Sequence, residues 1–328
     1  MTILRIGAAP EPYIDYEAAL LAAANNDTFR AATAQLFAAQ VLDLSGLTGI
    51  TFDSTNDVGN AFTIGLDTTA YYAMKLGDGF SMVGGTIKAK ANRAIYVNGA
   101  ISVSFRGTDI YVDSGSAGVF SWATGLATVS VENMVIRGDT QTVQSAFFCI
   151  VGASMHASGM YAEACISFSS AMIFDYSGAV IPSTTLLSCG CPGGTLLFLK
   201  AESEVTLLTI RGCYAQRLVA NPGTITTFVG GNNAYDTTLA GTTGPGDVAG
   251  VTDFEVDSAG VPDDGGVLTT VIPVGVHIGT SSTDVYGKPR WTPNQHVGPV
   301  QRQQRGRTQG GRLGRGSVGG SPRSARLG

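Results

Sequence analysis

The chain has 328 residues, of which 14% are charged and 44% hydrophobic, and its net charge is −5. The apolar content is ample for a core and excludes a disordered chain. No apolar run approaches the length of a membrane span, and the start, MTILR, lacks the basic and long apolar regions of a secretory signal peptide. Residues 1–300 hold 13 basic against 25 acidic residues, a net charge of −12, so this acidic body is not expected to bind nucleic acid non-specifically.

Residues 1–45 are predicted to form a helical N-terminal region. The stretch 15–24 is rich in Ala and Leu, which are the strongest helix formers. Asp27 then stands where it can N-cap a second helix over 28–40. The apolar residues at helical spacing in that second segment are Phe29, Ala32, Leu36 and Phe37. We expect this region to cover the open end of the body, and a role as an anchor to a partner particle is compatible with that.

Short β-rich segments recur between residues 46 and 240, and each turns at a Gly or an Asn. The clearest are 80–87, 103–110 and 129–136. The turn residues that serve as anchors are Gly85, Gly107, Asn133, Gly159, Gly190, Gly212 and Gly231. Their spacing of roughly 20 to 30 residues is typical of a solenoid. Short strands without a long helical pattern between them predict a mainly β fold, a single-stranded parallel β-helix over 46–240.

The five cysteines are odd in number: Cys149, Cys165, Cys189, Cys191 and Cys213. Cys189 and Cys191 have the wrong spacing for a zinc knuckle, and no His follows at ligand distance, so no metal site is predicted. When the anchors are aligned, Cys191 and Cys213 each follow a glycine by one residue. We therefore expect these two to stack as small buried hydrophobic residues.

Residues 241–300 are predicted to hold a turn-rich loop, a last β stretch over 267–278 and a closing turn. The turn residues follow an Asp-x-x-Gly-x-Pro-Arg pattern made of Asp284, Gly287, Pro289 and Arg290. With the Val297–Gly298 strand that follows, the pattern resembles the closing motif of pectate-lyase-like right-handed β-helix proteins, although Pro299 stands where Ala is common. Such ends are frequent in spike and fibre proteins of phages. The resemblance implies a right-handed coil and a homotrimer.

Residues 301–328 form a basic Gly/Arg-rich tail with seven Arg, no acidic residue and no aromatic residue. Alone it is expected to be disordered. One interpretation is a basic arm for nucleic acid or for an acidic partner surface. The other is a solvated tail, or a reading-frame artefact beyond a natural end near Gln301. The second is favoured, because aromatic residues for base stacking are missing.

Cleavage of a polysaccharide needs two carboxylates that flank the glycosidic bond, or a basic residue beside a calcium site. Aligned anchors place Arg106 and Glu132 just before their turns on adjacent repeats, which predicts a surface ion pair. Asp109 and Glu132 are the weak catalytic candidates, since no close pair of acids shares a register. The three histidines lie far apart in the sequence. We therefore predict a binding role rather than an enzymatic one, and no cofactor.

Aromatic residues on the repeats are the candidates for ligand binding. They are Tyr96, Tyr111, Trp122 and Tyr161. They are suited to stacking on sugar rings, although packing against a partner subunit or a loop is the favoured interpretation of such residues.

Together these features predict a virion structural spike or fibre protein, such as a head or tail spike of a phage or gene transfer agent, that binds host surface polysaccharide. The expected partners are other virion proteins, that polysaccharide and copies of the chain, without membrane insertion or nucleic acid. The virion would assemble in the host cytoplasm and leave by lysis. The alternatives are a glycan depolymerase, either lyase or hydrolase, and a bacterial surface adhesin, which the missing signal peptide disfavours.

Overall fold

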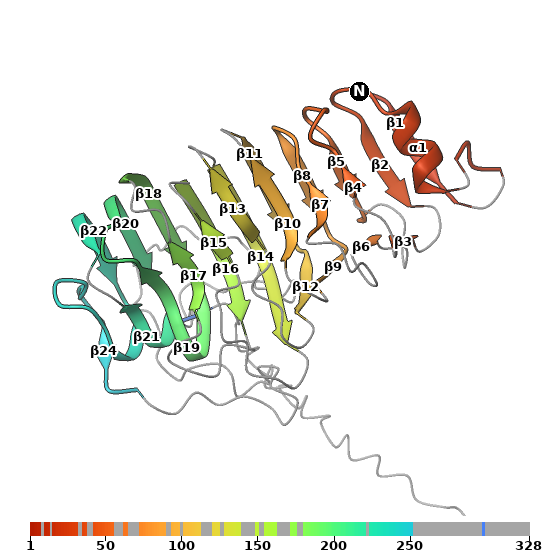
Figure 1. Ribbon diagram of the computed structural model, residues 1–328. Helices are drawn as coiled ribbons and strands as arrows, with labels where there is room; N and C mark the ends of the chain where they lie inside the picture. The colour runs from red at the N-terminus through yellow and green to blue at the C-terminus, as the bar shows by residue number, and fades with distance from the viewer. Residues whose placement is uncertain are drawn as a thin grey trace, which may run out of the picture.

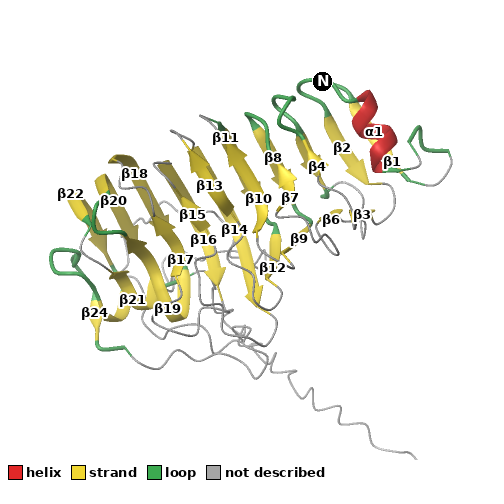
Figure 2. Cartoon of the chain, in the orientation of Figure 1, coloured by secondary structure: helices red, strands yellow, loops and turns green. Residues whose placement is uncertain are grey.

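The computed structural model describes part of the chain, and Figure 1 shows that its strands lie side by side along a rod with α1 at one end. The described residues are 1–7, 10–13, 15–31, 35–37, 42–55, 62–64, 72–89, 93–98, 101–112, 120–124, 128–138, 148–150, 154–162, 171–175, 180–220, 223–251 and 297–298. Figure 2 shows how little helix the rod contains. Within the described ranges, no helix is long and apolar enough to cross a membrane.

The strands form three parallel ladders, because each strand pairs with the equivalent strand of the next repeat. The first ladder runs through β1 (Ile3–Ile6), β2 (Thr28–Ala31), β5 (Thr51–Asp53), β8 (Phe80–Val83), β11 (Ser102–Arg106), β14 (Thr128–Gly138), β16 (Ser154–Ala162), β18 (Val180–Leu187), β20 (Glu204–Arg211) and β22 (Thr224–Gly231). Long strands such as β14 and β16 bend and continue into the second ladder.

The second ladder runs through β3 (Gln35–Phe37), β6 (Phe62–Ile64), β9 (Thr86–Ala89), β12 (Asp109–Val112), the ends of β14 and β16, the starts of β19 (Gly190–Leu199) and β21 (Tyr214–Ala220), β23 (Ala234–Thr237) and β24 (Val248–Ala249). The third runs through β4 (Leu42–Asp43), β7 (Tyr72–Lys75), β10 (Arg93–Asn98), β13 (Phe120–Thr124), β15 (Phe148–Ile150), β17 (Ala171–Asp175) and the ends of β19 and β21. The chain is therefore a β-solenoid, as predicted.

The length of one repeat can be read from the register of the first ladder. The shortest step is 20 residues, from Thr209 to Val229, and the longest is 30, from Thr51 to Ser81. The spacing that the turn residues predicted is therefore confirmed. The ladder begins at Ile3, in the region that the sequence assigned to a helical cap.

From Gly84 onward, the corner between the first and second ladders holds a left-handed residue at the same register position of each repeat. Its occupants, with their φ angles, are Gly84 (71°), Gly107 (62°), Asn133 (51°), Gly159 (69°), Ser188 (48°), Gly212 (62°) and Asn232 (57°). Four of the predicted anchors stand at this position. Gly85, Gly190 and Gly231 lie one or two residues away from it, because Gly84, Ser188 and Asn232 occupy the position in their repeats. Gly85 has a positive φ as well, of 80°.

The core consists of side chains that point inward from all three ladders. Phe52 is fully buried, and its ring centroid lies 5.0 Å from that of Phe29, 5.1 Å from that of Phe62 and 5.5 Å from that of Phe80. Phe80 contacts Phe105 on the next repeat, with centroids 5.9 Å apart. This aromatic stack joins successive repeats, because each ring packs on the one before it.

The N-terminal region contains one helix, α1 (Tyr16–Ala22), which the Asp15 side chain caps as it accepts the Ala18 N–H at 2.9 Å. The predicted second helix over 28–40 is wrong, because β2 and β3 occupy that stretch. Phe29 is buried in the aromatic stack, and this packing overrides local helix propensity. Asp27 instead accepts the N–H groups of Thr2 at 2.7 Å and of Ala24 at 3.0 Å.

Candidate functional site

The outer side of the first ladder carries a row of hydroxyl side chains, one on each of several repeats. Its members are Thr51, Ser81, Ser104, Ser130, Thr185 and Thr209, and His156 takes the place of a hydroxyl between Ser130 and Thr185. We call this set the hydroxyl row. The residue that follows each member is buried, as with Phe105 and Val131, so the row itself points outward.

From Ser81 onward, each member of the hydroxyl row stands three residues before a corner residue, as Ser104 does before Gly107 and Thr185 before Ser188. Neighbouring strands of a ladder are about 4.8 Å apart, so the hydroxyls repeat at that interval. Ser104 Oγ donates to Ser81 Oγ at 3.0 Å, which links two repeats directly. The row was missed in the sequence, although its constant offset from the turn residue is a signal that could have found it.

A second line of small polar residues lies two positions earlier on the same strands. Ser102 and Thr128 are paired in register and exposed. Farther along, Ser183, Leu207 and Thr227 are paired in register, and Leu207 is 38% exposed. The outer side of the first ladder therefore carries hydroxyls along a second line as well, which Leu207 interrupts.

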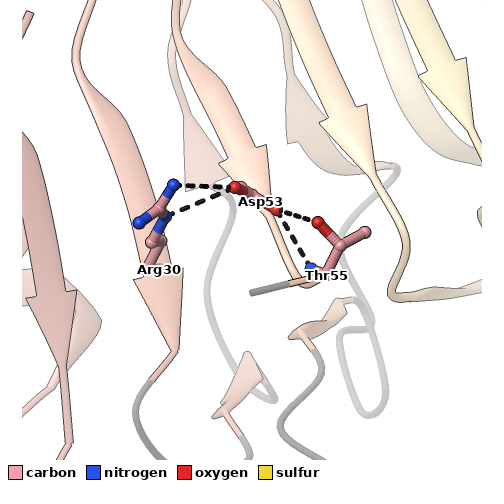
Figure 3. A network of polar contacts seen from close by, with 3 residues as sticks. All are labelled: Arg30, Asp53 and Thr55. Carbon is pink, nitrogen blue, oxygen red and sulfur yellow. Dashed lines mark hydrogen bonds and ion pairs between the residues drawn. The ribbon is translucent and has the colours of Figure 1, made fainter. Parts of the chain in front are cut away.

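Charged residues border the hydroxyl row at the position just before the corner. Arg106 Nε lies 3.1 Å from Glu132 Oε2 on the adjacent repeat, so the predicted ion pair is present. Figure 3 shows a second pair nearer the N-terminus, in which Arg30 Nη2 lies 3.2 Å from Asp53 Oδ2. The other carboxylate oxygen of Asp53 accepts the Thr55 N–H at 3.0 Å and the Thr55 hydroxyl at 2.7 Å.

The two weak catalytic candidates lie on opposite sides of the corner. Glu132 ends the first-ladder part of β14, and its carboxylate is engaged by Arg106. Asp109 begins β12 in the second ladder, where its register partners are Thr86 and Val135. Glu132 therefore forms a surface ion pair with Arg106, which is a common structural arrangement.

The candidate aromatic residues fall on two ladders, and none lies on the first. Tyr111 on β12 and Tyr161 on β16 belong to the second ladder. Tyr96 on β10 and Trp122 on β13 belong to the third. Their side chains lie outside the described part of the structure. The backbone alone therefore separates the four residues into two pairs on different ladders.

Three buried cysteines line the coil beside the corner: Cys189, Cys191 and Cys213. The stacked pair is Cys189 with Cys213, not the predicted Cys191 with Cys213, because the turn residue of that repeat is Ser188 rather than Gly190. The Cys189 N–H donates to Cys213 Sγ at 3.3 Å. Complete burial, reinforced by the neighbouring Cys189, raises the pKa of Cys213 well above its ordinary value, which keeps it a neutral thiol.

The closing motif is described only at Val297 and Gly298, and Asp284, Gly287, Pro289 and Arg290 lie outside the described residues. The Gly298 N–H donates to the Gly212 carbonyl at 2.6 Å, and the Tyr214 ring leaves no room for a side chain at position 298. Tyr214 lies between the core residues Cys213 and Ala215 and so points outward, yet it is only 1% exposed. The Val297–Gly298 segment therefore covers the outer side of the second ladder at this point.

Within the described ranges, no group of three or more His, Cys, Asp or Glu side chains is arranged to hold a metal ion. The chain matches no protein family model, no curated protein and no solved structure. The class that the structure itself defines is a parallel β-solenoid with a hydroxyl-lined outer ladder.

Proposed function

We propose that the protein is a virion spike or fibre protein that binds host surface polysaccharide along the outer side of the first ladder. The observation that supports this best is the hydroxyl row, in which Ser81, Ser104 and Ser130 stand in register on consecutive repeats. The closing motif near the C-terminus, with its resemblance to phage spikes, supports the virion assignment. A homotrimer and contacts to other virion proteins belong to the same proposal.

A row of hydroxyls suits a neutral polymer of sugars. Each hydroxyl both donates and accepts hydrogen bonds, and so does each sugar hydroxyl. The interval of about 4.8 Å between strands is close to the length of one pyranose unit in an extended chain. A polysaccharide that lies along the rod would therefore meet the same partners on each repeat. Bridging water molecules would complete contacts that are too long for a direct bond.

Binding of purified protein to host capsular polysaccharide and lipopolysaccharide tests the proposal. The variants Ser104→Ala, Ser130→Ala and Thr185→Ala each remove one hydroxyl of the row without adding bulk. A net hydrogen bond contributes about 1 kcal/mol, so each variant should weaken binding roughly fivefold. The matched control is Thr86→Ala, which removes an outward hydroxyl from β9 of the second ladder and should bind as the parent chain does.

Equal affinity in all four variants would argue against the hydroxyl row as the binding surface. Loss of affinity in Thr86→Ala alone would move the surface to the second ladder. The same incubations are assayed for new reducing or unsaturated sugar ends. Release of such ends would show that the protein cleaves the polysaccharide and would favour a depolymerase over a binding protein. The variants Asp109→Asn and Glu132→Gln would then be assayed first for loss of cleavage. Mass spectrometry of purified particles tests whether the chain is part of a virion.

A further inference from the structure

The two ends of the rod differ in how far their apolar side chains are buried. At the N-terminal end α1 lies against β1, with Ala19 fully buried and Leu20 packed on the core (Figure 1). At the other end, the last repeat contributes Ile225, Phe228 and Leu239, which pack against the core but are only partly buried. Within the described ranges, these three side chains therefore keep part of their apolar surface exposed at the C-terminal end.

The strand at this open end is β22, which lies last in the first ladder (Figure 1). Among the described residues it pairs only with β20. The loop that contains Gly244 and Pro245 covers its final residues, Gly230 and Gly231. It does not reach the start of the strand: Thr224, Thr226 and Thr227 are exposed.

Among the described residues, no strand pairs with the outer side of the β22 backbone. The Thr224 N–H donates to the Ser203 carbonyl of the preceding repeat at 2.9 Å. Since backbone groups alternate in direction along a strand, the next N–H and C=O, those of Ile225, face away from the rod. Such a row of backbone donors and acceptors at an edge is a template for another strand.

Natural edge strands are usually guarded by charged residues or by proline. Neither occurs in Thr224–Gly231, whose sequence is TITTFVGG. The Glu204 carboxylate on the neighbouring strand β20 already accepts the Thr226 hydroxyl at 2.9 Å. The edge of β22 is therefore uncharged, extended and rich in β-branched residues, which favours strand pairing.

We propose that the Thr224–Val229 edge of β22 pairs with the same edge of a second copy, in an antiparallel arrangement that joins two rods end to end. A two-fold axis sets identical strands against each other, and an uncharged strand does this without like charges opposite one another. Pairing would satisfy the outward backbone groups and bring the partly buried Ile225 and Phe228 of both copies together. This interface is separate from the hydroxyl row.

Sedimentation velocity of the full chain over a range of concentrations tests this pairing. The variant Thr227→Lys places a charge on the edge strand. The matched control Leu207→Lys places the same charge at the same register on β20, one repeat away from the edge. We expect the parent chain and Leu207→Lys to associate reversibly in end-to-end pairs, whether each half of the pair is a single rod or a homotrimer. The dissociation constant of this pairing should be raised by about fivefold or more in Thr227→Lys.

Hydrogen exchange supplies a readout that a folding defect cannot imitate. In the dimer, the amides of residues 224–229 should gain protection as concentration rises, while those of β20 remain unchanged. A parent chain that is monomeric at every concentration would overturn the proposal. So would a concentration-dependent association that Thr227→Lys leaves unchanged, or one that both lysine variants weaken equally.

Discussion

Two substitutions at the corner between the first and second ladders test its backbone conformation. Gly107→Ala adds a side chain at this position, and Ser188→Gly removes one. Both positions hold the left-handed residue of their repeat, with φ angles of 62° and 48°. A side chain at such a residue costs about 1–2 kcal/mol, since its Cβ approaches the neighbouring carbonyl. The structure therefore predicts that the first substitution destabilises the fold and the second stabilises it.

The sizes of the two effects follow from the surroundings. A Cβ at position 107 would meet no atom within 4 Å, so only backbone strain opposes Gly107→Ala. Part of that strain is offset by the stiffer unfolded chain, which leaves a loss of about 1 kcal/mol. Ser188 carries a buried Oγ with no hydrogen-bond partner, and its removal also relieves strain. The greater flexibility of glycine in the unfolded chain costs about 0.5–1 kcal/mol. Ser188→Gly should therefore raise the free energy of unfolding by about 1 kcal/mol or more.

Urea unfolding followed by far-ultraviolet circular dichroism measures both free energies, provided that the slope with urea is unchanged. The control is Gly46→Ala, because Gly46 has no positive φ and a Cβ there meets no atom within 4 Å. It should change stability by less than about 1 kcal/mol. A neutral Gly107→Ala together with a destabilising Ser188→Gly would refute the assignment of this corner to left-handed residues.

Three further predictions concern the core, the N-terminal turn and the thiols. Phe52→Ala should lower the free energy of unfolding by about 3–5 kcal/mol, measured in urea, because it empties the centre of the aromatic stack. The N–H groups of Thr2 and Ala24 lower the pKa of Asp27 below 3.8 in the folded protein. The ionised carboxylate therefore stabilises the fold above that pH, and this stabilisation is lost as the pH falls through the pKa of the folded state. The free energy of unfolding should consequently fall less steeply with decreasing pH in Asp27→Asn than in the parent chain. The raised pKa and burial of Cys213 predict that thiol reagents modify it only at the rate of unfolding; rapid labelling of the native protein would contradict this.

The repeat was predictable because the turn of each repeat needs a particular backbone conformation. Glycine and asparagine tolerate the left-handed region best, so Gly107, Asn133, Gly159 and Gly212 mark the corner in the sequence itself. The repeat that turns at Ser188 could not be recognised in this way, since serine carries no such signal. That single residue displaced the alignment and gave Cys213 the wrong partner.

The hydroxyl row illustrates the same limit for the candidate site. Ser104 and Ser130 are ordinary surface residues when read along the chain, and they become a site only when the register stacks them. By contrast, the pair of Arg106 and Glu132 was predictable, because both residues directly precede well-marked corners. A site that consists of one residue per repeat is visible in the sequence only where the alignment of the repeats is correct.

The β-solenoid, its repeat length and most of its corners depend on local backbone preferences that recur along the chain, so they could be predicted from the sequence. That Thr28–Ala31 is a strand rather than a helix depends on packing, since the burial of Phe29 against Phe52 outweighs the helix propensity around it. Strand pairing likewise shows that, in the part of the chain that the structure describes, β22 is the last strand of the first ladder. Burial and strand pairing depend on residues from distant repeats, and no local pattern contains that information.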